Sequence, residues 1–359
     1  MNRSRRAFLS TAGLALGAGC VGELTADRSG KRTSSGGKRT ETTDISLLLN
    51  WKPNGLHAPY YAAKGEGFYE DQGLALADVE SGQGSDFAAK QAGLGNTNFA
   101  ITSADQVLNV NSRELSPLSV GVVMQRSPVV LFTARENFGA RFTAVEQLEG
   151  KTLGTGPGMV RLLSKLMLER KGVLRSVELV DTGYDTVQRL LSGRIDAAGG
   201  VFGDVVAARH QGYTIDSVPV ASVIPSYGHV IATSKRFARD RSEMVRAFVR
   251  ATARGATWAH RHPEAAIDHL VDAVPVLAES REQQLDKWKL MSSAFMLSDT
   301  VRTKGWGWSA PKPWRTTYEA LHGADLLGGS VDPSSVWTND YIDTDYEYIV
   351  SYAETVSES

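Results

Sequence analysis

The sequence has few of the residues that form disulfide-bonded, metal-binding or membrane-spanning structures. One cysteine, Cys20, stands in 359 residues, which excludes an internal disulfide and zinc sites made of several cysteines. The chain has 39 basic and 40 acidic residues, so it lacks the basic excess of a general nucleic-acid binder. No apolar run reaches the ~18 residues of a membrane-spanning helix. The remaining composition, 42% hydrophobic and 22% charged, is typical of a globular chain of about two domains.

The first twenty residues carry the pattern of an export signal. Residues 4–9 read SRRAFL, a twin-arginine pattern, and an apolar stretch follows up to residue 19. Its length of about 13 residues is too short for a membrane helix, so a signal peptide over 1–20 is predicted. The small residues before Cys20 are similar to a lipobox, so we expect cleavage there and lipidation of Cys20. The alternative is a soluble exported protein in which Cys20 is discarded or unmodified.

Both ends of the remaining chain look irregular. Cleavage before Cys20 removes three arginines and changes the net charge from −1 to −4. Residues 21–44 are dominated by Gly, Ser, Thr and charged residues, which predicts a flexible tether. Residues 346–359 are assigned to a C-terminal tail, and the polar stretch 351–359 is expected to fray.

Between these ends, apolar runs and helical periods alternate in two successive units. The alternation predicts an α/β fold with mostly parallel sheets, followed by a mainly helical region over 242–326. Strands are predicted at 45–50, 74–80, 99–102, 118–124, 129–134, 152–154, 177–180, 197–201, 217–223 and 229–233. Helices are predicted at 58–72, 85–93, 103–111, 160–171, 186–192, 205–211, 242–260, 263–273, 279–296 and 312–326.

Two α/β units in an exported chain indicate two lobes with a small ligand between them. We assign 45–134 plus 228–345 to lobe one and 135–227 to lobe two, with crossings near 134–142 and 223–227. In such an arrangement the ligand lies at strand ends and helix N-termini, and the two crossing segments act as a hinge.

One segment carries a family resemblance. Residues 49–69, LNWKPNGLHAPYYAAKGEGFY, resemble the opening of the solute-binding proteins for thiamine pyrimidine precursors, within a wider group of riboflavin, alkanesulfonate and nitrate binders. The resemblance continues at 190–198 (LLSGRIDAA) and 338–342 (TNDYI), and so covers about 45–345. It implies a periplasmic-binding-protein type II fold, bilobal with a two-segment hinge. It also implies delivery of the ligand to the permease and ATPase subunits of an ABC importer.

The same fold includes an enzyme that makes the thiamine pyrimidine from its own histidine and pyridoxal phosphate, and the chain resembles it too. That chemistry needs a lysine and a histidine four residues apart, where this chain has Thr102 and Gln106. It also needs a cysteine-rich iron motif, where residues 224–229 read IPSYGH. The seven histidines are scattered and no Gly-x-Ser-x-Gly elbow occurs. We therefore predict a binding protein with no catalytic residues, metal or cofactor.

Candidate ligand contacts in lobe one follow from the shape of an aminopyrimidine, which has two π faces and a polar edge. Trp51, just past the first strand, is predicted to stack on the ring, with a core tryptophan as the alternative. Asn54 can read the polar edge or form a turn, and His57 can contact the ligand or start a helix. Of two adjacent tyrosines, Tyr60 is preferred over Tyr61 as the one that faces the cleft.

Further candidates lie at other junctions and at the crossings. Ser103 is a ligand contact or a helix cap, and Gln125 ends a strand near the first crossing. In lobe two, Gly156 belongs to the glycine turn 154–158, which offers backbone contacts but matches no phosphate-binding loop.

The last three candidates follow later strands. Asp204 can accept a hydrogen bond from an exocyclic amine, Phe202 can cover a second ring face, and Tyr227 lies at the return crossing. The sequence thus predicts an exported, lipid-anchored solute-binding protein for a thiamine pyrimidine precursor or a similar flat heterocycle. Riboflavin, an alkanesulfonate or a nitrate-like anion stay open as alternatives, although few arginines lie in the proposed cleft. The predicted partners are the ligand, the importer subunits and the membrane, and nucleic acid is not among them.

Overall fold

The computed structural model describes residues 42–357. The predicted signal peptide, the lipidation site Cys20 and nearly all of the predicted tether lie outside the described residues. Among the helices of the described part, none is both long and apolar enough to cross a membrane. No group of three His, Cys, Asp or Glu within 42–357 is placed to hold a metal ion.

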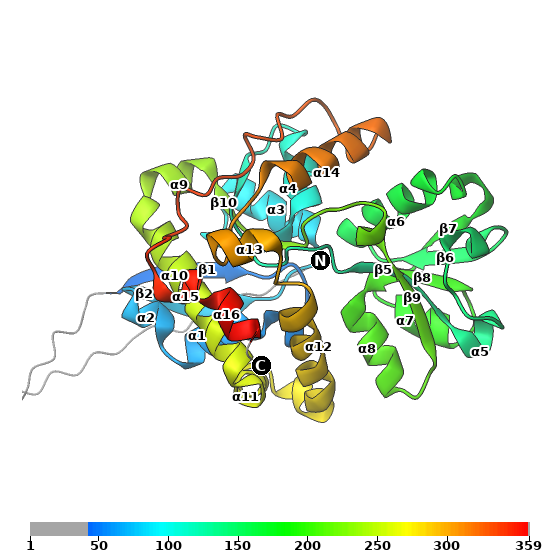
Figure 1. Ribbon diagram of the computed structural model, residues 1–359, viewed down its shortest axis with the longest axis horizontal. Coiled ribbons are helices and arrows are strands. Elements are labelled where there is room, and N and C mark those ends of the chain that lie inside the picture. Colours follow the sequence, from blue (N-terminus) through cyan, green and yellow to red (C-terminus); the bar gives the residue numbers. More distant parts are fainter. Residues whose placement is uncertain (1–41, 358–359) are drawn as a thin grey trace, which may run out of the picture. The chain divides into compact units, whose positions relative to one another are not determined.

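The first sheet is mixed and defines lobe one. Its order is β2-β1-β3-β10-β4. Figure 1 labels β1, β2 and β10 of this sheet. Strand β1 pairs in parallel with β2 and β3, whereas β10 is antiparallel to both β3 and β4. Every residue of β3 and β10 is buried, as expected for central strands covered on both faces. The strands are β1 (Thr43–Leu48), β2 (Leu74–Glu80), β3 (Phe99–Ser103), β4 (Pro117–Val122) and β10 (His229–Ser234).

The second sheet defines lobe two and repeats the same plan. Its order is β7-β6-β8-β5-β9, with β6 parallel to β7 and β8 and β5 antiparallel to β8 and β9. In each sheet, therefore, one strand from elsewhere in the chain joins a parallel core in antiparallel orientation. The strands are β5 (Val129–Ala134), β6 (Thr152–Thr155), β7 (Glu178–Asp181), β8 (Ala197–Val201) and β9 (Ile215–Pro219).

The position of β5 corrects the first predicted crossing. The strand was predicted at its observed bounds but was assigned to lobe one, whereas Val130 pairs with Gly200 in the second sheet. The chain therefore leaves the first sheet between Val122 and Val129, not at 134–142. A fully buried strand has the same apolar pattern in either sheet, so the local sequence does not reveal its partner. The return lies between β9 and β10, which includes the predicted 223–227.

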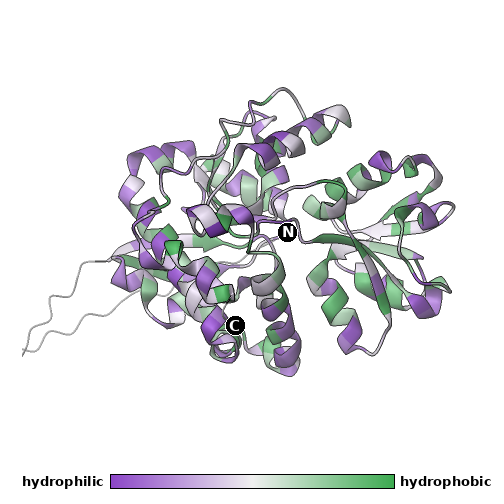
Figure 2. Ribbon diagram, in the orientation of Figure 1, coloured by the Kyte–Doolittle hydropathy of each residue, from purple (hydrophilic) through white to green (hydrophobic). Residues whose placement is uncertain are grey.

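Helices cover both sheets. The long helix α10 buries one side against the core of lobe one, and its hydrophobic and hydrophilic residues alternate in Figure 2. The helix predicted at 58–72 is two helices, because Gly67 takes a left-handed φ of 72° between them. Lobe one has α1 (Ala58–Gly65), α2 (Phe68–Asp71), α3 (Ser85–Leu94), α4 (Ala104–Asn111), α9 (Lys235–Asp240), α10 (Ser242–Arg261), α11 (Pro263–Ala273), α12 (Arg281–Ala294), α13 (Asp299–Lys304) and α14 (Pro311–Gly323). Lobe two has α5 (Arg135–Phe138), α6 (Met159–Arg170), α7 (Thr186–Leu191) and α8 (Phe202–His210).

The C-terminal segment is packed rather than frayed. Two short helices, α15 (Glu347–Val350) and α16 (Tyr352–Ser357), end the described chain. Ile349 and Tyr352 are fully buried in the core of lobe one. The prediction of a loose polar tail was therefore wrong for residues up to 357. Apolar residues three and four positions apart give these helices an inward face that the average composition hides.

Candidate ligand-binding site

A cavity of about 360 Å³ lies between residues of the two lobes. Lobe one supplies the loop after β1, the start of α3, the first residue of β10 and one side of α12. Lobe two supplies the turns before α6 and α7 and the end of β8. The cavity thus lies at strand ends and helix N-termini, where open α/β sheets bind small ligands.

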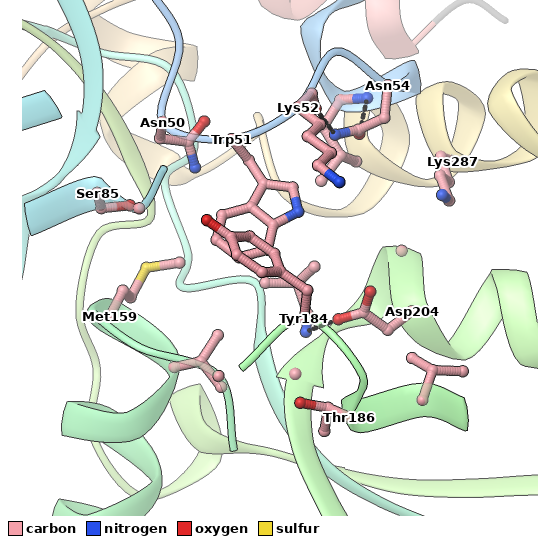
Figure 3. Close-up of a pocket in the computed structure, with 18 of the residues that line it drawn as sticks. Asn50, Trp51, Lys52, Asn54, Ser85, Met159, Tyr184, Thr186, Asp204 and Lys287 are labelled. Atoms are coloured by element: carbon pink, nitrogen blue, oxygen red, sulfur yellow. Dashed lines mark hydrogen bonds between the residues drawn. The ribbon is translucent and has the colours of Figure 1, made fainter. Parts of the chain in front are cut away.

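Two aromatic rings from different lobes meet at the cavity (Figure 3). The ring centroids of Trp51 and Tyr184 are 4.9 Å apart and the planes are tilted by 40°. Lys52 places its ammonium 5.2 Å from the centre of the Tyr184 ring. Trp51 was predicted, whereas Tyr184 was missed although it follows β7 much as Trp51 follows β1. At 58% exposure Tyr184 is an unusually open aromatic, which suits a surface that a ligand covers.

A glycine loop holds the backbone of Trp51. The N–H of Gly82 donates to the Trp51 carbonyl at 3.2 Å, and the N–H of Gly84 donates to Asn50 at 2.9 Å. A Cβ atom at Gly82 would lie 1.8 Å from the carbonyl oxygen of Leu49. The β2–α3 loop therefore packs directly on the segment that presents the tryptophan.

Asn50 joins two buried histidines beside this segment. Its Oδ1 lies 2.9 Å from Nε2 of His57, and its Nδ2 lies 3.0 Å from Nε2 of His229. The backbone N–H of Asn54 donates to Nδ1 of His57 at 3.2 Å. The histidine rings are parallel within 2°, with centroids 6.1 Å apart. We call Asn50, Asn54, His57 and His229 together the histidine relay.

Burial keeps both histidines neutral. Loss of solvent holds the pKa of His57 well below its usual value, and nearby His229 and Lys287 lower it further. Burial alone lowers the pKa of His229 to about 4. Each ring therefore has one N–H donor and one acceptor nitrogen at neutral pH.

The depressed histidine pKa predicts an acid-sensitive fold. Below pH 6.5 His229 becomes protonated in the unfolded chain, whereas in the folded protein it stays neutral down to about pH 4. The free energy of unfolding therefore falls as the pH is lowered from 6.5 to 4. The contribution is at most about 3 kcal/mol. Denaturant titrations of the wild type and His229→Gln between pH 7 and 4 should show that the wild type loses more unfolding free energy.

The difference between the two proteins reports the titration of His229 together with its coupling to His57, whose pKa burial lowers and His229 lowers further. Burial raises the pKa of Asp105 to about 6, which favours the folded state as the pH falls from 6 toward 3.8 and opposes the histidine. Both proteins contain Asp105, so its contribution cancels. Parallel pH profiles would contradict the assignment of a neutral His229.

One acidic and one basic side chain face each other across the cavity. Figure 3 shows the Lys287 amine and the Asp204 carboxylate pointing toward the space between α12 and α8. Burial raises the pKa of Asp204, while the N–H of Val201, 2.8 Å from Oδ2, and Lys287 lower it. Burial also lowers the pKa of Lys287, against the attraction of Asp204. No ion pair within 4.0 Å joins Lys287 to a carboxylate of the described residues.

The structure brings together five of the ten predicted contacts, since Trp51, Asn54, His57, Gly156 and Asp204 all line the cavity. The amide of Asn54 is occupied by its own turn, because Oδ1 accepts from the N–H of Leu56 at 3.0 Å and Nδ2 donates to the Lys52 carbonyl at 2.9 Å. Asn54 therefore shapes the loop and caps the short helix at 55–57.

The other five predicted contacts do not line the cavity. Tyr60 is fully buried in the core of lobe one, because α1 turns that face toward α10. Ser103 is buried at the end of β3, opposite His229. Phe202 stacks on Phe295 with centroids 4.2 Å apart, which places its ring between α8 and α12.

Gln125 and Tyr227 instead stabilise the two segments through which the chain passes between the lobes. Gln125 accepts a hydrogen bond from the hydroxyl of Ser298 at 2.9 Å and donates to the carbonyl of Trp308 at 3.2 Å. The hydroxyl of Tyr227 accepts from the N–H of Ala310 at 2.8 Å. Both crossing segments are thus fastened to the region that precedes α14.

Thr102 and Gln106 stand where the pyrimidine-forming enzyme needs a lysine and a histidine, and both side chains form hydrogen bonds within the protein. The hydroxyl of Thr102 donates to the Ser85 carbonyl at 2.6 Å. The amide of Gln106 donates to Oδ2 of Asp105 at 2.9 Å. Neither a hydroxyl nor an amide can form the Schiff base that a lysine forms with pyridoxal phosphate.

Two α/β lobes with a cavity at their strand ends define the fold class of the periplasmic binding proteins, and solved structures share this fold. The periplasmic nitrate-binding protein NrtA from Synechocystis PCC 6803 has a TM-score of 0.66 over 88% of this chain and 91% of its own, at 10% identity. Within that class, the chain belongs to the NMT1/THI5 like family, whose model matches residues 54–266.

Curated relatives in this family carry both binding-protein and enzyme names. The riboflavin-binding protein RibY of Chloroflexus aurantiacus is 26% identical over 306 residues, 83% of this chain and 86% of its own. The formylaminopyrimidine-binding protein of Halalkalibacterium halodurans is 27% identical over 266 residues, 70% of this chain and 78% of its own. A 4-amino-5-hydroxymethyl-2-methylpyrimidine phosphate synthase of Legionella pneumophila is 23% identical over 257 residues, 67% of this chain and 77% of its own. The two relatives with the higher identities are thus named as binding proteins.

Proposed function

We propose that the protein is the solute-binding component of an ABC importer that captures a thiamine pyrimidine precursor or a similar flat heterocycle. The observation that carries the proposal is the aromatic pair Trp51 and Tyr184, contributed by different lobes at one cavity of about 360 Å³. Ligand pockets of small molecules have volumes of roughly 300–1,000 Å³. The two centroids, 4.9 Å apart, are too close to hold a third ring between them, so a planar ring can stack on both side chains only after the two lobes move apart.

The polar groups around the cavity suit a heteroaromatic edge. The free oxygen of Asp204 can accept from an exocyclic amine, and Lys287 can donate to a carbonyl oxygen or a ring nitrogen. An aminopyrimidine with a formyl group offers both kinds of atom. A single lysine with a carboxylate opposite it is a poor site for a doubly charged anion, because the carboxylate repels it.

Riboflavin is the second candidate, favoured by the similarity to the relative named for it. Its ring system is also planar and presents carbonyl oxygens and ring nitrogens along one edge. An aromatic pair fits either ligand, so the residues that touch the edge decide between them.

The two-lobed plan supports a proposal for how the ligand is delivered to the importer. The proposed cycle is capture of the ligand, closure about the crossing segments and docking of the closed form on the permease.

We further propose export through the twin-arginine signal and anchoring through lipid on Cys20. Labelled fatty acid should be incorporated by the wild type and not by Cys20→Ser. Incorporation by both would reject the anchor.

Ligand-dependent stabilisation tests the proposal directly. The compact unit 41–359 is purified, and its melting temperature is measured with formylaminopyrimidine, riboflavin, an alkanesulfonate and nitrate. A ligand at 100 times its Kd adds about 2.7 kcal/mol of stability. We expect formylaminopyrimidine to raise the melting temperature. A shift with the alkanesulfonate or nitrate alone would reject a flat heterocycle as the ligand.

A further inference from the structure

The Lys287 side chain extends from lobe one to lobe two. It begins on α12, where a Cβ atom added at Gly55 would lie 3.0 Å from the Cβ of the lysine. Its far end lies beside α8, because a Cβ atom added at Gly203 would lie 3.5 Å from Cδ and 3.6 Å from Cε of the lysine. The base of this side chain is therefore packed on lobe one, and its outer carbons border lobe two.

The ammonium group at the end of this side chain has no ionic partner. Lys287 lines the cavity and is half-buried, and Figure 3 shows its amine directed toward the space between α12 and α8. Within residues 42–357 no carboxylate lies within 4.0 Å of it. A charged group with three N–H donors, partly withdrawn from water and left without a counter-charge, suits an acceptor atom of a ligand.

The charge of Lys287 acts on groups of both lobes. Burial lowers the pKa of His57, a member of the histidine relay in lobe one, and His229 and the lysine lower it further. Burial raises the pKa of Asp204 in lobe two, and the N–H of Val201 and the same lysine lower it. A ligand edge that reaches Lys287 thus meets a donor that belongs to lobe one and a carboxylate that belongs to lobe two.

We propose that Lys287 couples ligand recognition to lobe closure, and that Gly203 is the positioning residue for its side chain. The ammonium donates to a carbonyl oxygen or a ring nitrogen of the ligand while the lysine carbons lie beside Gly203, where no side chain takes their place. This inference rests on the proposed function and adds that closure depends on the acceptor atom of the ligand. A flat ring without that atom leaves the lobes free to separate.

Opening of the lobes removes the support of this donor. When α8 moves away from α12, Lys287 loses its neighbour Gly203 and regains the rotamer freedom of a long side chain. Its ammonium is then hydrated and no longer held at one point of the cavity. The donor is pre-organised in the closed form, so an acceptor bound to it favours that form.

Lys287→Met removes the ammonium and keeps an unbranched side chain. We expect it to weaken the binding of formylaminopyrimidine or riboflavin, whichever the wild type binds, roughly tenfold or more. Lys289→Met is the matched control, because Lys289 lies on the same helix, pairs with Glu264 at 3.0 Å and does not line the cavity. This control should bind like the wild type. Affinity of Lys287→Met within twofold of the wild type would overturn the inference.

A distance across the cavity measures closure itself. The unit 41–359 contains no cysteine, so Val276→Cys and Gln188→Cys place one spin label on each lobe. Both residues are exposed, and each adjoins a residue that lines the cavity. Saturating ligand should shorten the distance between the labels in the otherwise wild-type protein and not in Lys287→Met. An equal response of the two proteins, whether a change or none, would overturn the coupling.

A leucine at position 203 tests the role of the glycine. Its side chain would occupy the place of the lysine carbons, so Gly203→Leu should weaken binding roughly tenfold. In Lys287→Ala that place is empty, and Gly203→Leu should add no more than about a twofold loss. Thermal unfolding of each variant checks that the fold is retained. Equal losses in the two backgrounds would overturn the role of Gly203.

Failure of the proposed function gives a different pattern. If the wild type binds only the alkanesulfonate or nitrate, the flat-heterocycle proposal is rejected. These oxyanions are acceptors too, so Lys287→Met and the labelled pair are then measured with the one that binds. Loss of both affinity and the distance change would support the role of Lys287, and wild-type behaviour would overturn it.

Discussion

Replacing Trp51 by alanine is expected to weaken the binding of formylaminopyrimidine by roughly 5- to 150-fold, while the unfolding free energy changes little. Stacking of a base on an aromatic side chain is worth about 1–3 kcal/mol, which corresponds to this range of affinity. Trp51 is only partly buried and its aromatic contact is Tyr184 of the other lobe, so its removal leaves the core of lobe one intact. Calorimetric titration gives the affinity, and thermal unfolding gives the stability.

Trp308 provides the matched control. It is also a partly buried tryptophan in a loop, but it does not line the cavity. Trp308→Ala is expected to leave the affinity near that of the wild type. Tyr184→Ala and the double variant Trp51→Ala, Tyr184→Ala complete a cycle that measures the coupling of the two rings in binding, to which both their direct contact and a shared ligand contribute. Wild-type affinity in Trp51→Ala would remove this residue from the site.

Gly82→Ala is expected to reduce both stability and binding. The added Cβ would lie 1.8 Å from the Leu49 carbonyl oxygen and 2.8 Å from the carbonyl carbon of Asn50, so backbone has to move on one side or the other. Overpacking of this kind costs about 1–3 kcal/mol. The displaced segment carries Trp51, so the affinity should fall at least as far as in Trp51→Ala. Denaturant unfolding and calorimetric titration of the same preparation measure the two losses.

The effect of the added methyl group alone is checked at Gly323. This residue ends α14, and a Cβ there would have no atom within 4 Å. Gly323→Ala is expected to be neutral, or stabilising by up to about 1 kcal/mol, because alanine favours the helix. If Gly82→Ala behaved like Gly323→Ala, the β2–α3 loop would not hold the tryptophan segment in the way described.

Local sequence patterns predicted most strands and the long helices, but not which strands pair. Strands β2 and β5 lie at their predicted residues, because short apolar runs bounded by polar residues are a local signal. The lobe to which β5 belongs depends on pairing between Val130 and Gly200, seventy residues later in the chain. Nothing near residue 130 encodes that choice. The same limit applied to the C-terminal helices, whose inward face matters only once α10 is in place.

The candidate site likewise contains residues that local patterns predicted and residues that only the tertiary fold brings to the cavity. Trp51 and Asp204 were predicted because each follows a strand, and His57 because it lies at the start of a helix, and the sequence reveals both kinds of position. Lys287 and His229 were missed, since α12 and β10 come late in the chain and reach the cavity only through the tertiary fold. On a helical pattern Lys287 looks like an ordinary solvent-exposed lysine. Its role depends on Asp204, which no local pattern connects to it.

The contacts between α8 and α12 bear on how a ligand could enter and leave. Phe202 stacks on Phe295, and His210 lies 2.7 Å from the carboxylate of Asp286, so lobe two is attached to lobe one along this seam. Separation at the seam gives up a stacked ring pair and a hydrogen bond. Separation at Trp51 and Tyr184 gives up a tilted ring contact and the contact of the Lys52 ammonium with the Tyr184 ring. The aromatic residues proposed to contact the ligand would then also govern how long it stays bound.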